Sequence, residues 1–280
     1  KNLIKKIDMS KRLNLQLVVT GSHLSKKFGN TINEIISDEF EISYKVDMKL
    51  TNDSPVKILH SIGIGLTKFG KVFDKLKPDL VLLIGDRYEL FASAIPSIIN
   101  RIPIAHIHGG ELTEGAIDEY IRHSITKLSS LHFVATKEAK QRVIQLGENP
   151  KFIKLVGGLG VDNIYNFTKI SKKVIEKKLN FSFGKKSLLV TYHPTTMELM
   201  NPEDEIKILI DVINQNPEIN YIITSSNADV GGQRISKKMS NLAKKNNNIC
   251  YVESLGQKLY FSCLSYVDGV IGNSSSGLLE

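Results

Sequence analysis

The sequence has few cysteines, no tryptophan and no long apolar run. Its 280 residues include only Cys250 and Cys263, too few for a disulfide framework, and their apolar surroundings predict buried thiols. No apolar run approaches the roughly 20 residues that a membrane-spanning helix needs. The N-terminus KNLIKKIDMSKRL is basic and amphipathic without the apolar core of a signal peptide. These absences predict a cytoplasmic protein that does not associate with membranes.

The charge balance is basic but dispersed. Lysine and arginine number 37 against 29 aspartates and glutamates, which gives a net charge of +8. A positive balance favours anionic ligands, including nucleic acid. The lysines fall in polar stretches such as 171–178 and 237–245, however, and no nucleic-acid-binding module is present. We therefore expect no nucleic-acid partner and a phosphorylated small molecule instead, with a binding module as the non-enzyme alternative.

Short apolar runs alternate with helical periods along the whole chain. Unalternating apolar runs of this length are typical of strands that are buried on both faces. They lie at 15–19, 80–84, 103–107, 131–135, 152–156, 188–192, 219–224, 250–252 and 267–271. Helical periods lie at 30–37, 56–76, 90–99, 117–128, 137–146, 202–214, 233–245 and 258–263. The alternation predicts an α/β protein whose parallel sheets carry helices on both faces.

The number of these units exceeds what one ordinary sheet holds. A Gly-rich turn at 157–160 and a lysine-rich stretch up to residue 186 predict a break, which gives two doubly wound, Rossmann-like domains at 1–160 and 170–280. Residues 1–7 are typical of a helix without its preceding strand, and the chain stops at GNSSSGLLE, where a further helix begins. We therefore expect both domains to be truncated.

Two motifs of the first half follow predicted strands, where ligands bind in open α/β sheets. Asp86 and Arg87 of GDRYE follow the predicted strand at 80–84, although Asp86 could also serve as the N-cap of a helix. In HIHGGE, His106 and His108 share one face if the strand continues. Three interpretations stay open for this motif: a metal site, a core histidine at His106, and a polar site made by His108 and Glu111.

A third motif, IDEYIRH, opens a predicted helix. Asp118 and Arg122 lie four residues apart and face the same side, so a surface ion pair is the simplest interpretation. The short loop after Glu111 nevertheless brings Asp118 to the same sheet edge as Asp86. Clustered carboxylates repel one another, so one can retain its proton at neutral pH, and such pairs serve as general acids and bases.

The second half offers groups that suit a phosphate. His193 follows a strand in LLVTYHP, Asn227 lies in TSSNADVGG, and VIGNSSSG contains a serine-rich turn before a helix. Backbone N–H groups of such a turn, together with a helix N-terminus, bind anions. The turn comprises Ser274, Ser275, Ser276 and Gly277.

Taken together, these segments resemble the bacterial hydrolysing UDP-N-acetylglucosamine 2-epimerases of sialic-acid biosynthesis. The resemblance runs in order through LVVTGSHLSKKFGNTINEI, LIGDRYELF, PIAHIHGGE, IDEYIRHSITKLS, RVIQLGE, YHP, SSNAD and GNSSSGLLE. It implies a two-domain, glycosyltransferase-B-like fold, no cofactor, no metal and a homodimer. It also implies elimination of UDP to a glycal, followed by addition of water to give N-acetylmannosamine.

The resemblance assigns roles residue by residue. Asp86 and Asp118 match the acid/base carboxylates, and His108 stands where animal members have glutamate, so either His108 or Glu111 is left for that role. Arg87 is a candidate to stabilise the departing UDP. The remaining matches line the substrate cleft or bind the nucleotide: His23, His193, Asn227, Ser274, Ser275 and Glu280. Arg122, Ser276 and Gly277 are further candidate substrate-binding residues within the same motifs.

Three related activities remain open at this point. Some bacterial enzymes of this type act on UDP-2,4-diacetamido-2,4,6-trideoxyglucose, the precursor of legionaminic acid. A non-hydrolysing 2-epimerase returns UDP to the sugar, but its pattern around the helix acidic pair differs from IDEYIRHSITK. A glycosyltransferase of the same fold needs an acceptor, and fold alone does not fix function.

Overall fold

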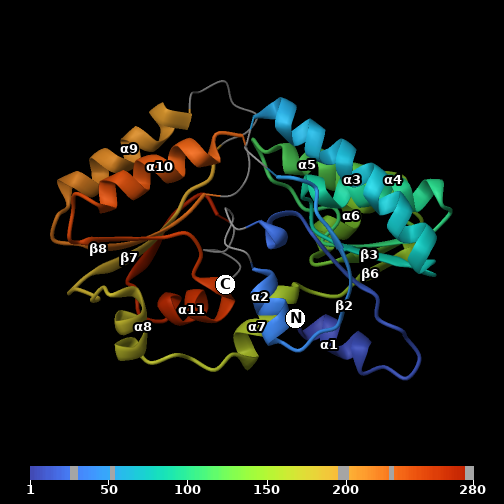
Figure 1. Cartoon of the computed structure of the whole chain (residues 1–280), viewed down its shortest axis with the longest axis horizontal. Coiled ribbons are helices and arrows are strands. Elements are labelled where there is room, and N and C mark those ends of the chain that lie inside the picture. Colours follow the sequence, from blue (N-terminus) through green and yellow to red (C-terminus); the bar gives the residue numbers. More distant parts are fainter. Residues whose placement is uncertain (26–30, 51–53, 195–201, 227–229, 275–280) are drawn as a thin grey trace.

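The structure is a computed structural model and describes residues 1–25, 31–50, 54–194, 202–226 and 230–274. Its strands form three sheets, and every strand pair is parallel. A two-stranded sheet and a four-stranded sheet lie in the N-terminal half, and a second four-stranded sheet lies in the C-terminal half (Figure 1). The α/β class predicted from the sequence is therefore confirmed.

The N-terminal half contains the sheets β1-β2 and β3-β4-β5-β6. Its strands are β1 (Leu17–Thr20), β2 (Ile42–Val46), β3 (Val81–Ile84), β4 (Ile104–Ile107), β5 (Leu131–Val134) and β6 (Ile153–Leu155). Its helices are α1 (Asn2–Asp8), η1 (Gly21–Leu24), α2 (Ile32–Ser37), α3 (Pro55–Leu76), α4 (Tyr88–Ile99), α5 (Ile117–Leu128), α6 (Lys137–Gln145), η3 (Pro150–Phe152) and α7 (Leu159–Asn166).

The C-terminal half contains a sheet with the order β10-β7-β8-β9. Its strands are β7 (Ser187–Thr191), β8 (Asn220–Thr224), β9 (Ile249–Val252) and β10 (Gly269–Gly272), and its helices are α8 (Lys172–Leu179), α9 (Pro202–Gln215), α10 (Gly232–Ala243) and α11 (Gly256–Leu264). The order reverses between β7 and β10, because β8 and β9 are added on one side of β7 and β10 on the other. In open α/β sheets, such a switch point is where ligands bind.

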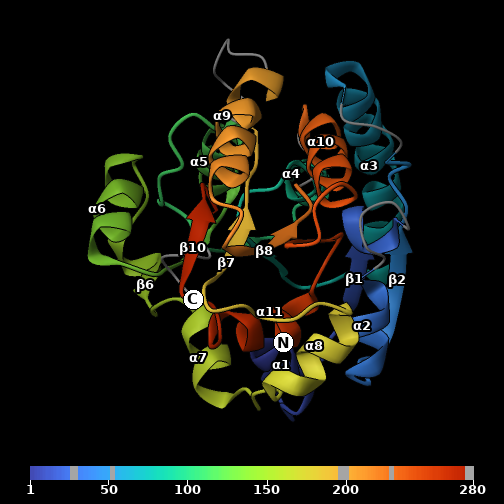
Figure 2. The ribbon, with the colours of Figure 1, turned by 90° about the vertical axis from the view of Figure 1, so that its left-hand side faces the viewer.

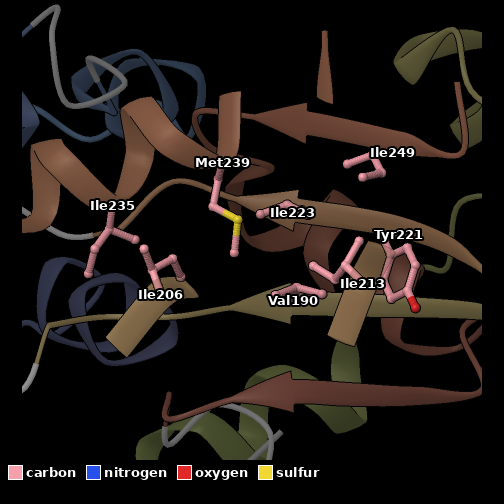
Figure 3. Close-up of a cluster of buried hydrophobic side chains, with 8 residues drawn as sticks. All are labelled: Val190, Ile206, Ile213, Tyr221, Ile223, Ile235, Met239 and Ile249. Atoms are coloured by element: carbon pink, nitrogen blue, oxygen red, sulfur yellow. The ribbon is translucent and has the colours of Figure 1, made fainter. Parts of the chain in front are cut away.

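Helices cover both faces of this C-terminal sheet. Figure 2 shows α9 and α10 over one face, with α8 and α11 under the other. The first face packs through a buried cluster that includes Val190, Tyr221 and Ile223 of the strands and Met239 of α10 (Figure 3). A second cluster, with Leu189 and Ile222, packs against α8 and α11. Burial on both faces explains why these strands are continuous apolar runs in the sequence.

The core of the N-terminal half places the ends of β3 and β4 beside α4 and α5. Leu83, Ala94, Ile104 and Ile125 form one buried cluster across these four elements. Because the strands are parallel, their carboxyl ends lie at one edge of the sheet. This packing brings the loops after β3 and β4 close to the first turns of the helices that follow.

The nine strands predicted from the sequence all form, with ends within two residues of the expected positions. Strand β2 and helix α7 are among the elements that were not predicted. In β2 only Val46 is buried and Tyr44 and Lys45 are exposed, so the apolar signal is weak and the strand depends on pairing with β1. Helix α7 begins directly after Gly158, in the segment that the glycines had suggested was a turn.

The segment between the halves associates with the C-terminal half from about residue 167 onward. The Phe167 ring packs edge-on against Phe261 of α11 at 5.6 Å, and the Ile170 N–H donates to Ser262 Oγ at 3.0 Å. These contacts lie close to the predicted domain boundary, and the division at 160 and 170 stays a prediction. Among the described residues, no helix is both long and apolar enough to cross a membrane.

The two cysteines are both unpaired. Cys263 is fully buried, and burial raises the pKa of its thiol to about 11, so it is not a nucleophile at neutral pH. Cys250 is half-buried, and burial raises the pKa of its thiol as well. The predicted buried thiol is confirmed at Cys263, and neither residue suits catalysis.

Candidate active site

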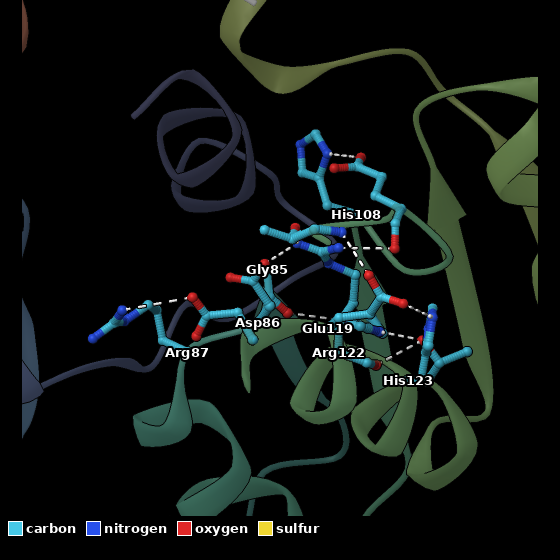
Figure 4. Close-up of polar contacts among 12 residues, drawn as sticks. Gly85, Asp86, Arg87, His108, Glu119, Arg122 and His123 are labelled. Atoms are coloured by element: carbon cyan, nitrogen blue, oxygen red, sulfur yellow. Dashed lines mark hydrogen bonds and ion pairs between the residues drawn. The ribbon is translucent and has the colours of Figure 1, made fainter. Parts of the chain in front are cut away.

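The carboxyl end of β3 carries the first ion pair of the site. Gly85 makes the turn after the strand with a φ of +90°, and its N–H donates to the Ile107 carbonyl of the neighbouring strand at 3.0 Å. Asp86 follows and accepts a hydrogen bond from the Arg122 guanidinium (Figure 4). Helix α4 begins at Tyr88 with residue 87 at its N-cap, so Asp86 is not the N-cap that the sequence had left open.

Arg122 is buried and connects three parts of the site. It lies on α5 with 5% of its surface exposed. Besides Asp86, it donates to the main-chain oxygen of Glu111 at 2.8 Å and to Thr113 Oγ1 at 2.9 Å. A buried guanidinium needs such partners because an unpaired buried charge is strongly destabilising. Arg122 therefore fixes the loop after β4 against the loop after β3.

A second arginine lies between two carboxylates. Arg87 Nη1 is 3.9 Å from Asp118 Oδ2, and Arg87 Nε is 3.6 Å from Glu89 Oε2 (Figure 4 shows Arg87). Glu89 is buried against Gly21, the residue that follows β1, where a Cβ atom would lie 2.8 Å from Glu89 Cγ. The site thus contains three carboxylate–arginine contacts at one sheet edge.

The two histidines of HIHGGE have different surroundings. His106 is completely buried, with Nε2 2.7 Å from the Gly85 carbonyl and Nδ1 3.1 Å from Thr126 Oγ1. Burial lowers its pKa to about 4, so it is neutral, and it supports the Gly85 turn from within the core. His108 lies past the strand end with a φ of +65°, so the strand alternation that would align the two rings stops before it.

His108 faces Glu111 instead. The distance from His108 Nδ1 to Glu111 Oε1 is 2.6 Å, and both side chains are partly exposed (Figure 4). Among the described residues, no group of three or more histidine, cysteine, aspartate or glutamate side chains is arranged to hold a metal ion. At this edge His108 pairs with Glu111, Asp86 pairs with Arg122, and Asp118 lies beside Arg87.

The glycines between His108 and Glu111 are required by close packing. A Cβ on Gly110 would lie 2.4 Å from the Ala139 carbonyl of α6, and Gly110 has a φ of +78°. The Gly110 carbonyl also accepts a hydrogen bond from Arg142. Helix α6 therefore holds the loop that presents the His108–Glu111 pair.

The second part of the candidate site lies at the switch point of the C-terminal sheet. His193 follows β7, and Ser226 Oγ, which follows β8, lies 3.5 Å from His193 Nδ1. The Ser226 N–H donates to Ser236 Oγ of α10 at 3.0 Å. Ser274 follows β10, and β10 is the neighbour of β7 in the sheet. These groups are uncharged hydroxyls and amides apart from His193.

The other predicted residues either lie farther from these contacts or fall outside the described residues. His23 is exposed on η1, with Nδ1 2.7 Å from Thr31 Oγ1, and lies two residues from the contact between Gly21 and Glu89. Five predicted binding residues lie outside the described residues: Asn227, Ser275, Ser276, Gly277 and Glu280.

The structure adds residues that the motifs had not singled out. Glu89 lies within GDRYE and Glu119 within IDEYIRH, so both were quoted without a role. Glu119 Oε2 accepts from the Thr113 N–H at 2.8 Å, and Thr113 in turn accepts from Arg122. The sequence signal for Glu119 was its adjacency to Asp118, but only the tertiary structure shows which carboxylate faces the loop.

Comparison with known proteins points to one family. The model of the UDP-N-acetylglucosamine 2-epimerase family matches residues 5–280. A GDP/UDP-N,N'-diacetylbacillosamine 2-epimerase (hydrolyzing) of Campylobacter jejuni is 40% identical over 281 residues, which span all of this chain and 73% of that protein. The polysialic acid biosynthesis protein P7 of Escherichia coli is 39% identical, over all of this chain and 71% of its own length.

Two further similarities agree with this. A UDP-N,N'-diacetylbacillosamine 2-epimerase (hydrolyzing) of Legionella pneumophila is 36% identical, over all of this chain and 74% of that protein. The solved structure of a UDP-GlcNAc 2-epimerase from Neisseria meningitidis, bound to UDP-GlcNAc, superposes with a TM-score of 0.78. That match covers 98% of this chain and 73% of the other at 18% identity, and it confirms the fold predicted from the sequence.

Proposed function

The chain belongs to the UDP-N-acetylglucosamine 2-epimerase family, and from that membership we propose that it is a hydrolysing 2-epimerase of a UDP-linked 2-acetamido sugar. The substrate loses the proton at C2 and the bond from C1 to the UDP oxygen, which leaves a glycal and UDP. Water then adds its hydroxyl to C1 and a proton to C2 from the opposite face. Substrate and water thus give the free 2-epimer and UDP.

The observation that carries this proposal is the pair of carboxylate–arginine contacts at one sheet edge, Asp86 with Arg122 and Asp118 with Arg87. The C2 proton of a sugar is barely acidic, so its removal needs a positioned base, and its return needs an acid. Asp86 and Asp118 are our candidates for these roles. Arg87 supplies positive charge toward the departing diphosphate.

The His108–Glu111 pair is a second proton carrier at the same edge. The short contact between the imidazole and the carboxylate lets one group hold the other in orientation while a proton moves. We place this pair at the sugar, where His108 or Glu111 exchanges a proton with C2 or with the attacking water.

We place the UDP on the C-terminal half, with the sugar toward the N-terminal half. His193 and Ser274 follow the strands on either side of the switch point between β7 and β10, where open α/β sheets bind ligands. UDP is common to substrate and product, so its contacts supply largely uniform binding.

For the sugar, the similarities favour UDP-N,N'-diacetylbacillosamine, the 2,4-diacetamido-2,4,6-trideoxy sugar. Relatives named for that substrate are 40% and 36% identical to this chain. The sequence analysis placed UDP-N-acetylglucosamine first, and a UDP-N-acetylglucosamine 2-epimerase of Neisseria meningitidis is 28% identical. We therefore propose the diacetamido sugar as the better substrate and UDP-N-acetylglucosamine as the weaker one.

The test is incubation of the protein with each nucleotide sugar in D₂O, with the products identified by NMR. The GDP-linked form of the diacetamido sugar is a third arm, since one relative is named for both nucleotides. We expect free 2-epimer with deuterium at C2, and UDP. A UDP-linked epimer as product contradicts the hydrolysing activity, and a requirement for an acceptor points to a glycosyltransferase.

The orientation of the substrate has its own test. His193→Ala should weaken UDP binding roughly 10- to 100-fold, since a hydrogen bond to a charged group is lost. His108→Ala should lower kcat with little change in UDP affinity. Titration calorimetry on both variants separates the roles, and the reverse pattern places UDP on the N-terminal half. The homodimer that the resemblance implied remains a prediction, which light scattering can check.

A further inference from the structure

The ends of β7 and β10 are joined by one side chain that no motif had singled out. The two strands pair in parallel register up to Gly272, which lies opposite Thr191. Beyond them, Asn273 Oδ1 accepts from the His193 N–H at 2.8 Å, and Asn273 Nδ2 donates to the His193 carbonyl at 2.8 Å. A carboxamide offers one acceptor and one donor side, so it matches the two backbone groups of a single residue.

The residue before it allows this contact. Gly272 has a φ of +144°, and a Cβ at that position would lie 1.8 Å from the Thr191 carbonyl oxygen. Any side chain would push β10 away from β7. Glycine therefore lets the two backbones approach and lets Asn273 reach His193.

The contact lies at the switch point of the sheet. His193 follows β7 and Ser274 follows β10, and Asn273 connects these two loops across 80 positions of the sequence. On its other side the His193 ring faces Ser226, which is held by Ser236 of α10. Asn273, which follows β10, thus fixes the backbone of His193, and Ser226, which follows β8, lies beside its ring.

We propose that Asn273 is a positioning residue of the nucleotide site, which holds the His193 backbone at a fixed distance from the turn at Ser274. His193 and Ser274 then contact the same diphosphate from positions that are already fixed relative to each other, and such preorganisation strengthens binding. This role rests on the proposed function, because it requires that His193 and Ser274 bind UDP. Asn273 itself acts through His193 rather than on the reacting atoms.

The first test is the UDP affinity of Asn273→Ala by titration calorimetry. We expect binding roughly 10-fold weaker from the loss of two hydrogen bonds, with kcat at saturating substrate unchanged and KM raised. Asn248→Ala is the matched control. Asn248 Nδ2 also bridges neighbouring loops, to the Ile219 carbonyl at 2.8 Å, but at the opposite end of the same sheet. The UDP affinity of the Asn248→Ala variant should equal that of the wild type.

A double-mutant cycle shows whether Asn273 acts through His193. In a His193→Ala background, Asn273→Ala should weaken UDP binding by less than about 2-fold, since the imidazole that it positions is gone. Additive losses overturn the proposal. Wild-type turnover together with unchanged affinity in Asn273→Ala also overturns it while leaving the proposed function intact. A wild type that binds no UDP overturns both.

A second variant guards against misfolding. Asn273→Asp keeps the size and the acceptor for the His193 N–H, and it places a negative charge beside the bound diphosphate. We expect its UDP affinity to fall roughly 5-fold below that of the alanine variant, while its affinity for uridine, which has no phosphate, equals that of the alanine variant. Equal losses for UDP and uridine in Asn273→Asp contradict the proposed place of Asn273.

Discussion

The two halves of the candidate site are built from different kinds of groups. In the N-terminal half, the described contacts join ionisable side chains: Asp86 with Arg122, Asp118 with Arg87, and Glu111 with His108. In the C-terminal half, the groups around His193 are hydroxyls and a carboxamide, with hydrogen bonds of 2.8 to 3.5 Å. The N-terminal side of the site thus consists of charged groups, whereas the C-terminal side consists mainly of uncharged hydrogen-bond donors and acceptors.

This difference matches the division of labour that we propose. Moving a proton to and from C2 requires groups that change charge, and such groups must be held by counter-charges when they are partly buried. Binding UDP equally in substrate and product requires only fixed donors and acceptors. The two sides should therefore respond differently to substitution and to pH.

The largest effect should come from Asp118→Asn, which keeps the shape of the side chain and removes its ability to exchange a proton. We expect kcat to fall by about 10²-fold or more, the scale for losing a positioned acid or base, with UDP affinity nearly unchanged. Steady-state kinetics and UDP titration measure both quantities. Glu114→Gln, an exposed carboxylate in the preceding loop, is the control and should retain activity. Near-wild-type turnover in Asp118→Asn removes this carboxylate from the chemistry.

The next effect concerns folding. Arg122→Met leaves Asp86, the Glu111 carbonyl and Thr113 without their donor, and breaking a buried ion pair costs about 3 kcal/mol or more. Thermal unfolding should shift down by roughly 10 °C. Lys49→Met is the matched control, because the side chains of Lys49 and of its ion-pair partner Asp47 are 63% and 49% exposed and such a pair should contribute about 1 kcal/mol or less. Equal unfolding temperatures for the two variants contradict the central role of Arg122.

Sequence reasoning reached the α/β architecture because parallel strands buried on both faces leave continuous apolar runs. It also placed Asp86, His108 and Asp118 after strands or at the start of a helix, where the structure has them. It did not find which group pairs with which. The spacing suggested that Asp118 faces Arg122, whereas Arg122 reaches Asp86 across 36 residues. Helical spacing describes neighbours on one element and carries no information about partners on another.

The same limit explains the residues that were passed over. Asn273 stands inside the quoted GNSSSG, but its partner His193 is 80 residues away, and its role depends on the β7-β10 pairing. The αL conformation of His108 ended the strand alternation that would have aligned it with His106. Both features are set by tertiary contacts, which a single sequence does not display.

The third prediction uses pH. His106 has a folded-state pKa of about 4, below the usual 6.5. Between these two pH values the unfolded chain therefore binds a proton at this residue and the folded chain does not. The contribution of His106 to stability is therefore present above pH 6.5 and is lost as the pH falls toward 4, by about 3 kcal/mol. Urea unfolding from pH 7 to 4 should show a smaller fall in His106→Gln than in the wild type.

Other histidines do not obscure this result. Burial also lowers the pKa of His132 and of His123, so both act in the same direction, but both are present in wild type and variant. The difference between the two proteins isolates His106. Parallel pH dependences would show that the pKa of His106 is the same in the folded and the unfolded chain, and this residue would then make no contribution to the acid sensitivity of the N-terminal half.

The smallest effect tests the neutral side. Ser236 Oγ accepts from the Ser226 N–H and lies 2.9 Å from Ser225 Oγ, so Ser236→Ala removes ordinary uncharged hydrogen bonds worth about 1 kcal/mol. Because Ser226 flanks the His193 ring, we expect UDP affinity to fall roughly 3-fold, with kcat unchanged and thermal unfolding lowered by about 3 °C. Calorimetry and a melting curve measure these shifts. A loss of UDP affinity as large as that of His193→Ala would mean that the hydroxyl network is coupled as tightly as the ion pairs, and the contrast between the two halves would not hold.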